Sequence, residues 1–135
     1  MEDLFWEDLR RDLEDPELLR EYVAESVKIA AVDAVVNALD DARISAGLSK
    51  AELARAIGAE PATVRRLFSA GDVNPTLSTL AVVAAALGLR ISVEPLPNED
   101  RKAVTEPLRS GHASGESLRR ISESRNGRRQ RLVRG

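Results

Sequence analysis

Apolar residues recur at helical spacing in the first part of the chain. The first helix is predicted over residues 4–13, where leucine and phenylalanine fall on one face. Asp15 can cap a helix and Pro16 suits its first position, so a new helix is expected to begin there. The apolar stripe with a period of 3.6 residues then continues to Gly47 without another glycine or proline. The pattern leaves open whether residues 16–46 form one helix or two.

Three short helices are predicted next, over residues 50–58, 61–68 and 77–87. Ser49 and Glu52 form a capping box, in which each side chain satisfies an amide at the start of the helix. Gly58 is suited to ending that helix, because glycine tolerates the left-handed conformation. Pro61 then starts the second helix, and residues 74–76 (Asn-Pro-Thr) supply a cap and a proline for the third.

The apolar period changes from 3.6 to two after the last of these helices. Leu89, Ile91 and Val93 alternate with polar residues until Pro95, which predicts one short β-strand. A lone strand leaves its backbone groups unpaired, so we expect it to pair with its symmetry mate or with a partner's sheet.

Apolar residues become sparse from Pro97 onward. Proline, glutamate, serine, glycine and arginine dominate, which indicates a disordered extension with a weak helix around residues 117–121. The predicted organisation is therefore all-α with one strand. It consists of an N-terminal helical extension (1–30), a central domain with the terminal strand (31–95) and a disordered basic tail (96–135).

Composition narrows the classes of function. The chain of 135 residues has no cysteine, and His112 is its only histidine, so a metal site, a cofactor or thiol catalysis is not expected. No plausible nucleophile and base occur together, which argues against an enzyme. The start of the chain is acidic, unlike a signal peptide, and no apolar run is long enough for a membrane span. We therefore expect a cytoplasmic protein with no membrane contact.

Charge is distributed unevenly although the net charge is only −2. Residues 1–25 are strongly acidic, residues 109–135 contain eight arginines and two glutamates, and the middle is close to neutral. Such asymmetry often indicates interaction tails, although both ends could also be simply solvated.

The segment from Ser49 to Phe68 has the pattern of a helix-turn-helix. Two short helices that cross steeply need a small residue at the crossing, where Ala54 falls, and a tight turn, where Gly58 falls. The buried side of the unit is predicted to hold Leu53, Ile57, Val64 and Leu67. The outer face of the second helix is predicted to hold Ala62, Thr63, Arg65, Arg66 and Ser69. Short and basic side chains on that face suit insertion into the major groove of DNA.

These residues resemble the repressor-type helix-turn-helix of the XRE class. The resemblance is carried by Leu39, Arg43, Gly47-Leu48-Ser49, Glu52-Leu53-Ala54, Ile57-Gly58, Val64, Arg66-Leu67, Asn74-Pro75-Thr76-Leu77, Thr79-Leu80 and Ala85-Ala86-Leu87-Gly88. It implies a lambda-repressor-like bundle that binds operator DNA. The wider layout, with Leu13 to Glu17 before the domain and a strand after it, resembles HigA-type antitoxins of type II toxin–antitoxin systems.

The sequence departs from this family at three places. Pro61 stands where the family often has a glutamine that reads adenine, Phe68 stands where a glutamate often pairs with the position of Arg43, and Asp72 lies near Gly71 where basic residues are usual. We therefore carry over only Arg66 and Thr63 as base-contacting candidates and assign Arg65 from geometry.

The residues predicted to bind DNA are Ser49, Lys50, Ala62, Thr63, Arg65, Arg66 and Asn74. Ser49 and Asn74 are included because helix starts present free amides to phosphates. One short helix contacts few bases, so a two-fold dimer is expected to read a pseudo-palindrome, with the predicted strand (Leu89, Ile91, Val93) as its seam.

The resemblance implies a repressor of its own operon that also holds an RNase toxin of the RelE/HigB type. The alternative is a stand-alone XRE-type regulator, from host or phage, with no toxin partner. Phe5, Trp6 and Leu9 could dock on a basic toxin, although packing of the aromatic rings in the protein's own core is the alternative interpretation. The arginine-rich tail could contact DNA phosphates or cover the acidic N-terminus.

Overall fold

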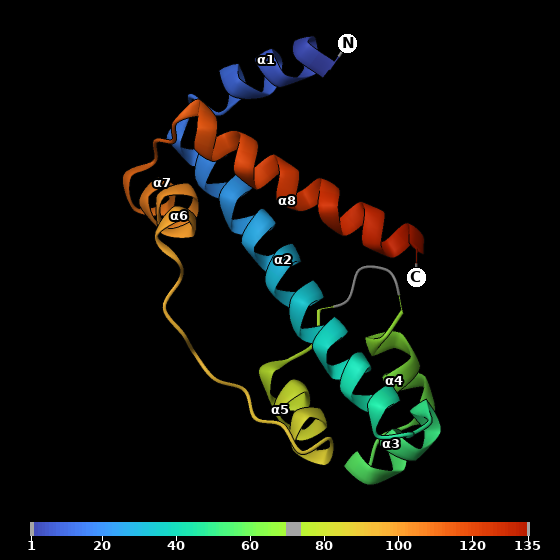
Figure 1. The fold of residues 1–135 in the computed structure, drawn as a ribbon. Helices are drawn as coiled ribbons and strands as arrows, with labels where there is room; N and C mark the ends of the chain where they lie inside the picture. The colour runs from blue at the N-terminus through green and yellow to red at the C-terminus, as the bar shows by residue number, and fades with distance from the viewer. Residues whose placement is uncertain (1, 70–73, 135) are drawn as a thin grey trace. The chain divides into compact units, whose positions relative to one another are not determined.

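The structure is a computed structural model that describes residues 2–69 and 74–134, and the side chains of residues 4–69 and 74–124. The described part is mostly helical and contains no β-strand (Figure 1). It divides into two compact units. The central unit comprises residues 31–94, and the terminal unit combines residues 1–30 with residues 95–134.

The long helix α2, Pro16–Ser45, contributes to both units. The stretch that sequence left undecided is therefore one uninterrupted helix. Its start follows the predicted signals, because the Glu17 backbone N–H donates to the Asp15 carboxylate at 2.9 Å and Pro16 occupies the first turn. Without an internal glycine or proline, nothing in the sequence breaks its backbone hydrogen bonds.

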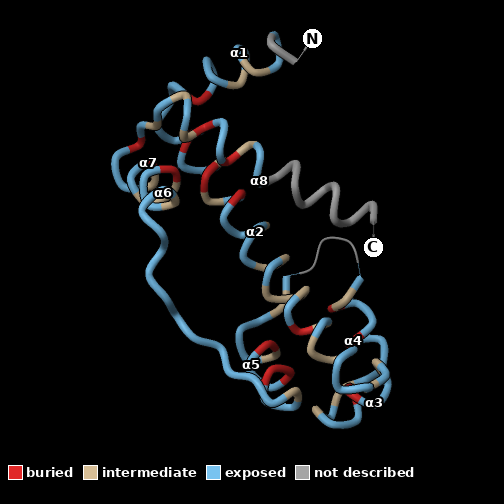
Figure 2. Tube along the Cα trace, in the orientation of Figure 1, coloured by how far each residue is buried: buried red, intermediate tan, exposed pale blue. Residues whose placement is uncertain are grey.

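The central unit is built from the second half of α2 and three short helices (Figures 1 and 2). These are α3 (Lys50–Ile57), α4 (Pro61–Leu67) and α5 (Leu77–Ala86). Their buried side chains form one apolar cluster: Leu39, Leu53, Ala54, Val64, Leu67, Leu80, Val83 and Ala84. The unit has a single core, since each helix turns one apolar face toward it.

The terminal unit joins the two ends of the sequence. It contains α1 (Glu2–Asp12), the first half of α2, α6 (Asn98–Asp100), the π-helical turn η1 (Arg101–Thr105), α7 (Glu106–Ser110) and α8 (Gly115–Arg134). Its core cluster is Leu13, Leu19, Val23, Ala103, Leu118 and Ile121. Trp6 and Leu9 pack against this cluster, and the Arg119 guanidinium lies 5.6 Å from the centre of the Trp6 ring.

The prediction of a disordered tail from residue 96 is wrong for the helical residues from Asn98 onward. The apolar side chains there are few, but Ala103, Leu118 and Ile121 meet a surface that α1 and α2 already present. The low average hydropathy of the tail hid this, because half of the core is supplied by residues 80 to 108 positions earlier in the chain.

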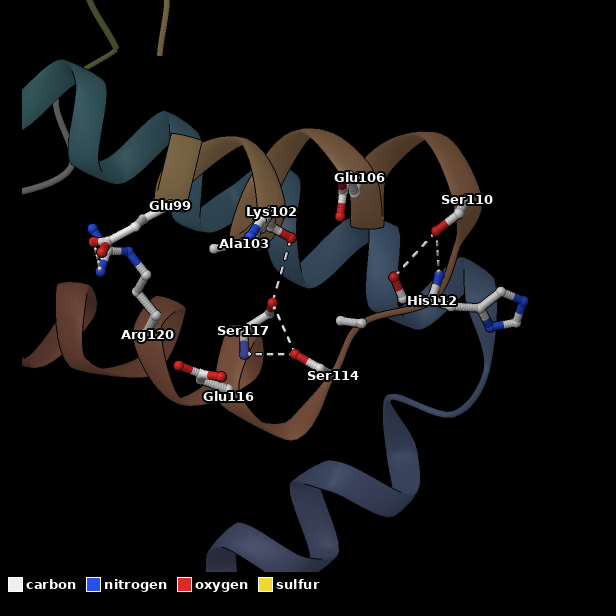
Figure 3. Close-up of a pocket in the computed structure, with 11 residues that line it drawn as sticks. Glu99, Lys102, Ala103, Glu106, Ser110, His112, Ser114, Glu116, Ser117 and Arg120 are labelled. Carbon is white, nitrogen blue, oxygen red and sulfur yellow. Dashed lines mark hydrogen bonds and ion pairs between the residues drawn. The ribbon is translucent and has the colours of Figure 1, made fainter. Parts of the chain in front are cut away.

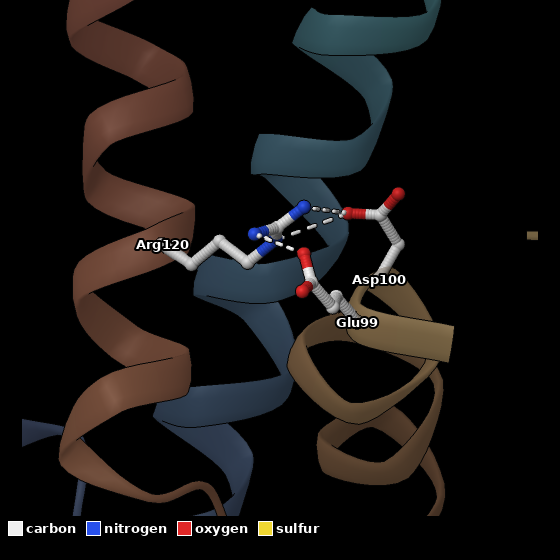
Figure 4. Close-up of polar contacts among 3 residues, drawn as sticks. All are labelled: Glu99, Asp100 and Arg120. Carbon is white, nitrogen blue, oxygen red and sulfur yellow. Dashed lines mark hydrogen bonds and ion pairs between the residues drawn. The ribbon is translucent and has the colours of Figure 1, made fainter. Parts of the chain in front are cut away.

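Polar contacts also hold the terminal unit together. The Arg20 side chain donates to the backbone carbonyls of Leu108 and Arg109 at 3.0 and 3.1 Å, at the end of α7. Arg120 on α8 bonds Asp100 and Glu99 on α6, each at 3.1 Å (Figure 4). Hydrogen bonding to Asp100 raises the pKa of Arg120 above its usual value. These are surface contacts, so they orient the helices more than they stabilise them.

The predicted strand at residues 89–93 is also wrong. This segment has no regular secondary structure and connects α5 to α6 (Figure 1). A strand is defined by its hydrogen-bonded partner, and the described residues of this chain contain no second strand to pair with it.

Candidate nucleic-acid interface

Helices α3 and α4 pack through small and branched residues. Ala54 on α3 is fully buried, together with Leu53, and faces Val64 and Leu67 of α4 in the same cluster. Gly58 ends α3 with a φ of 69°, a conformation that glycine adopts without strain. The small buried residue and this turn are therefore both where the sequence predicted them.

The outer face of α4 is free of core contacts. Ala62, Thr63, Arg65 and Arg66 are all exposed, while Val64 and Leu67 on the opposite side are buried. Neither arginine forms an ion pair with another described residue. The helix therefore presents two arginines and two short side chains to the outside.

The start of α3 is capped as the sequence predicted. The Glu52 backbone N–H donates to the Ser49 hydroxyl at 3.0 Å, and the Ser49 backbone N–H donates to the Glu52 carboxylate at 3.1 Å. This second bond, from the backbone of Ser49, lowers the pKa of Glu52 below its usual value. The backbone amides of Lys50 and Ala51 have no acceptor among the described residues, so they are the groups left for an anion.

The cap of α5 differs from the predicted one. Thr76 occupies the cap position, and its hydroxyl accepts from the Thr79 backbone N–H at 3.2 Å. Asn74 is exposed two residues earlier and does not cap the helix. A phosphate contact by Asn74 would therefore use its side chain and not a helix-start amide. Gly71 and Asp72, where the sequence departs from the XRE pattern, lie outside the described residues.

The segment that contains α3 and α4 was compared with models of known protein families. Residues 39–93 match the family model described as helix-turn-helix. This segment is a helix-turn-helix domain. No curated protein and no solved structure matches the chain. The match supports a DNA-binding transcriptional regulator of the XRE class.

Phe68 stands where the XRE pattern often has a glutamate that pairs with the position of Arg43, so Arg43 needs other partners here. Arg43 pairs with Asp40 at 2.8 Å, one turn earlier on α2, and donates to the Leu48 backbone carbonyl at 2.8 Å. Its guanidinium also lies 5.7 Å from the centre of the Phe68 ring. The acidic partner of Arg43 is therefore Asp40 on α2 instead of a residue that follows α4, and Phe68 contributes a cation–π contact. Asp40 and Arg43 are three residues apart, a helical spacing from which this pair could have been predicted.

The charge of the central unit is not that of a general nucleic-acid binder. Residues 31–94 contain six basic and seven acidic residues. Sequence-independent attraction to phosphates scales with the number of cations that can reach them. The central unit therefore lacks the excess of cations on which such attraction depends.

The residues predicted to bind a protein partner fall in different environments. Trp6 and Leu9 are partly buried against the core of the terminal unit, in line with the alternative interpretation of the tryptophan. Phe5 is 70 % exposed on α1. Leu89, Ile91 and Val93 are also exposed, at 44 %, 40 % and 98 %. Leu4, which the sequence pattern did not single out, is exposed beside Phe5.

A polar pocket of about 490 Å³ lies in the terminal unit (Figure 3). Its serines bond within the pocket: Ser114 with Ser117, and Ser117 with the Lys102 carbonyl. Ser110 bonds the backbone of His112, whose ring points away from the other serines (Figure 3). No described serine is thus paired with the imidazole as a nucleophile would be.

No described helix is long and apolar enough to cross a membrane.

Proposed function

We propose that this protein is a sequence-specific transcriptional repressor whose helix α4 reads operator DNA in the major groove. The observation that carries the proposal is the outer face of α4, which is exposed, short and basic while the inner face is buried in the core. A recognition helix needs this division, because its inner face must hold it rigidly while its outer face approaches base edges.

Within this proposal the side chains divide into two groups. Arg65 and Arg66 would donate two hydrogen bonds to guanine, and Ala62 and Thr63 are small enough to let the helix approach thymine methyl groups. Ser49, Lys50 and Asn74 are assigned to phosphates, with the free amides of Lys50 and Ala51 adding donors at the start of α3. The assignment is supported by the exposed side chains of Ser49, Asn74 and the four α4 residues, and by the partly exposed side chain of Lys50.

A two-fold dimer is part of the same proposal. Helix α4 has seven residues, and so short a helix covers only a few base pairs. Two copies on adjacent half-sites would double the contacts and give useful affinity.

The test uses duplex DNA from upstream of the protein's own gene at about 150 mM salt. Arg66→Ala should weaken binding by about 1–3 kcal/mol if the side chain pairs with a guanine. The matched control is Arg55→Ala, which removes the same exposed charge from α3. If the double variant Arg65→Ala/Arg66→Ala binds as tightly as wild type, α4 is not the reading helix.

We further propose that the repressor is the antitoxin of an RNase toxin and represses their shared operon. Support comes from the resemblance of Leu13 to Glu17 to the antitoxin motif and from α1, where Leu4 and Phe5 are exposed beside the carboxylates of Glu7 and Asp8. An apolar pair among carboxylates suits a basic RNA-binding surface. Trp6 and Leu9 would then hold α1 in place and not touch the toxin.

Co-purification with the product of an adjacent gene encoding a small basic protein tests this role. Phe5→Asp should abolish the complex and leave DNA binding intact, whereas Trp6→Phe should retain the complex because the ring still packs inside. If no such neighbour exists, or if Phe5→Asp leaves the complex intact, the alternative of a stand-alone XRE-type regulator is favoured.

A further inference from the structure

The polar pocket of the terminal unit has a helical wall of unusual geometry. The turn η1, which contributes Lys102 to the pocket, is π-helical, a form that is rare and often occurs at functional sites. Pro107 follows this turn and has no N–H, so the carbonyl of Lys102, five residues earlier, lacks the donor that a π-helix would supply. The Ser117 hydroxyl of α8 donates to that carbonyl at 3.3 Å instead. The π-helical wall is thereby bonded to the start of α8.

The hydroxyl groups of the pocket are already used, whereas several of its charges are not. Ser114 and Ser117 bond each other at 3.0 Å. The side chains of Lys102, Glu106 and Glu116 also line the pocket, and none of them bonds or pairs with a described residue. Lys102 and Glu106 stay unpaired although they are four residues apart, a spacing at which opposite charges pair on a regular helix. Figure 3 shows Glu106 on the α7 wall and Glu116 on the α8 wall.

We propose that this pocket binds a small hydrophilic zwitterion of the amino-acid class, with its ammonium group between Glu106 and Glu116 and its carboxylate on Lys102. Unpaired charges of both signs in one pocket select a ligand that carries both signs, because each side chain then gains a charge-assisted hydrogen bond. The volume of about 490 Å³ lies in the range of small-molecule sites. The apolar residues that line the pocket are Ala103 and Ala113, so the ligand has little apolar surface to bury.

Other ligand classes fit these side chains less well. Among the described residues, no group of three or more histidine, aspartate or glutamate side chains could hold a metal ion. A simple anion would meet two carboxylates, and a diamine would leave Lys102 unpaired beside a second cation. Glu99 and Arg120, which also line the pocket, are paired with each other at 3.1 Å. The ligand class therefore follows from the combination of one free lysine with two free glutamates.

This site goes beyond the proposed function and does not depend on it. The residues that line the pocket all lie between Glu99 and Arg120, outside the segment 39–93 that matches the helix-turn-helix model. A ligand here would bond η1 and α7 to the start of α8, so it should stabilise the terminal unit.

Thermal unfolding of the full chain in the presence of each common free amino acid tests the proposal. A ligand that binds only the folded state raises the melting temperature as its concentration increases. We expect at least one amino acid with a small polar side chain to do so, and isothermal titration calorimetry then gives its dissociation constant. The ligand controls are its amine without the carboxylate and its hydroxy acid without the ammonium group. Each should bind roughly tenfold more weakly or worse.

Variants of the three charged side chains locate the binding site. Lys102→Met and the double variant Glu106→Gln/Glu116→Gln should each raise the dissociation constant by roughly tenfold or more, because each removes charge-assisted hydrogen bonds. The matched controls are Lys28→Met on α2 and Glu123→Gln on α8, which remove exposed charges outside the pocket and should leave binding unchanged. All these side chains are exposed, so each variant should unfold at the wild-type temperature when no ligand is present.

Three results would overturn the inference. If no amino acid raises the melting temperature, the ligand class is wrong. If the amine alone binds as tightly as the amino acid, the pocket is a cation site in which Lys102 has no role. If Lys102→Met binds as well as its control Lys28→Met, the amino acid binds elsewhere. DNA binding by α4 is measured on separate variants, so each proposal can fail without the other.

Discussion

Arg43 shows how one side chain can keep a fold motif when a neighbouring residue departs from the family pattern. It is 13 % exposed and bonds Asp40 and the Leu48 carbonyl at the same time, with Phe68 beneath it. The planar guanidinium can do this because it offers several donors in fixed directions. The contact ties the end of α2 to the turn that starts α3.

Arg43→Lys should lower the free energy of unfolding by about 1–2 kcal/mol, because an ammonium on a flexible stem cannot reproduce both bonds and the stacking. Urea unfolding followed by circular dichroism measures this change. Arg55→Lys, on the exposed face of α3, is the control and should change stability by less than about 0.5 kcal/mol. Equal effects of the two variants would show that the Arg43 contacts contribute little.

At the scale of elements, the turn between α7 and α8 has the tightest backbone requirement in the terminal unit. Gly111 has a φ of 79°, and a Cβ there would lie 2.9 Å from the Pro16 Cβ and 3.3 Å from the Arg20 guanidinium. The residue is therefore fixed as glycine both by conformation and by the close approach of α2. Gly47 has a similar φ of 71°, but a Cβ would meet nothing within 4 Å.

This difference gives a matched pair of substitutions. Gly47→Ala should destabilise by about 1 kcal/mol, the cost of a left-handed conformation alone. Gly111→Ala should cost about 2–4 kcal/mol, because α7 must also move away from α2. Thermal unfolding of the two variants compares them. If they lose the same stability, the backbone at Gly111 can shift without cost.

At the scale of the whole molecule, the sequence of the central unit is inserted between the two halves of the terminal unit. Residues near both ends of the chain share one core, with Leu19 and Val23 buried among Leu118 and Ile121. Deleting residues 109–135 would therefore remove core residues as well as arginines. A deletion of residues 125–135 leaves every described core residue and still removes five of the eight arginines.

This shorter deletion separates the two roles considered for the tail. If its arginines bind DNA, the slope of log affinity against log salt should become shallower by roughly 0.9 for each phosphate that is no longer neutralised. Replacing the same arginines with lysine should keep the slope, since the charge remains. If the tail instead covers α1, the deletion should tighten toxin binding at an unchanged slope. No change in either measurement would leave the tail with neither role.

Local signals in the sequence were sufficient for the helix-turn-helix domain. The capping box at Ser49, the turn at Gly58 and the proline at residue 61 act within a few residues, so their effects can be predicted from neighbours alone. The alternation of buried Val64 with exposed Arg65 and Arg66 follows from the helical period in the same way. The match of residues 39–93 supports this part of the prediction.

Only the tertiary structure decided how the two ends of the chain fold. Ala103, Leu118 and Ile121 are too few to form a core by themselves, and they become buried because α1 and α2 supply the other side. Conversely, residues 89–93 have the pattern of a strand but lack a partner among the described residues. Burial and strand pairing are both properties of two segments that touch, so neither can be read from one segment of sequence.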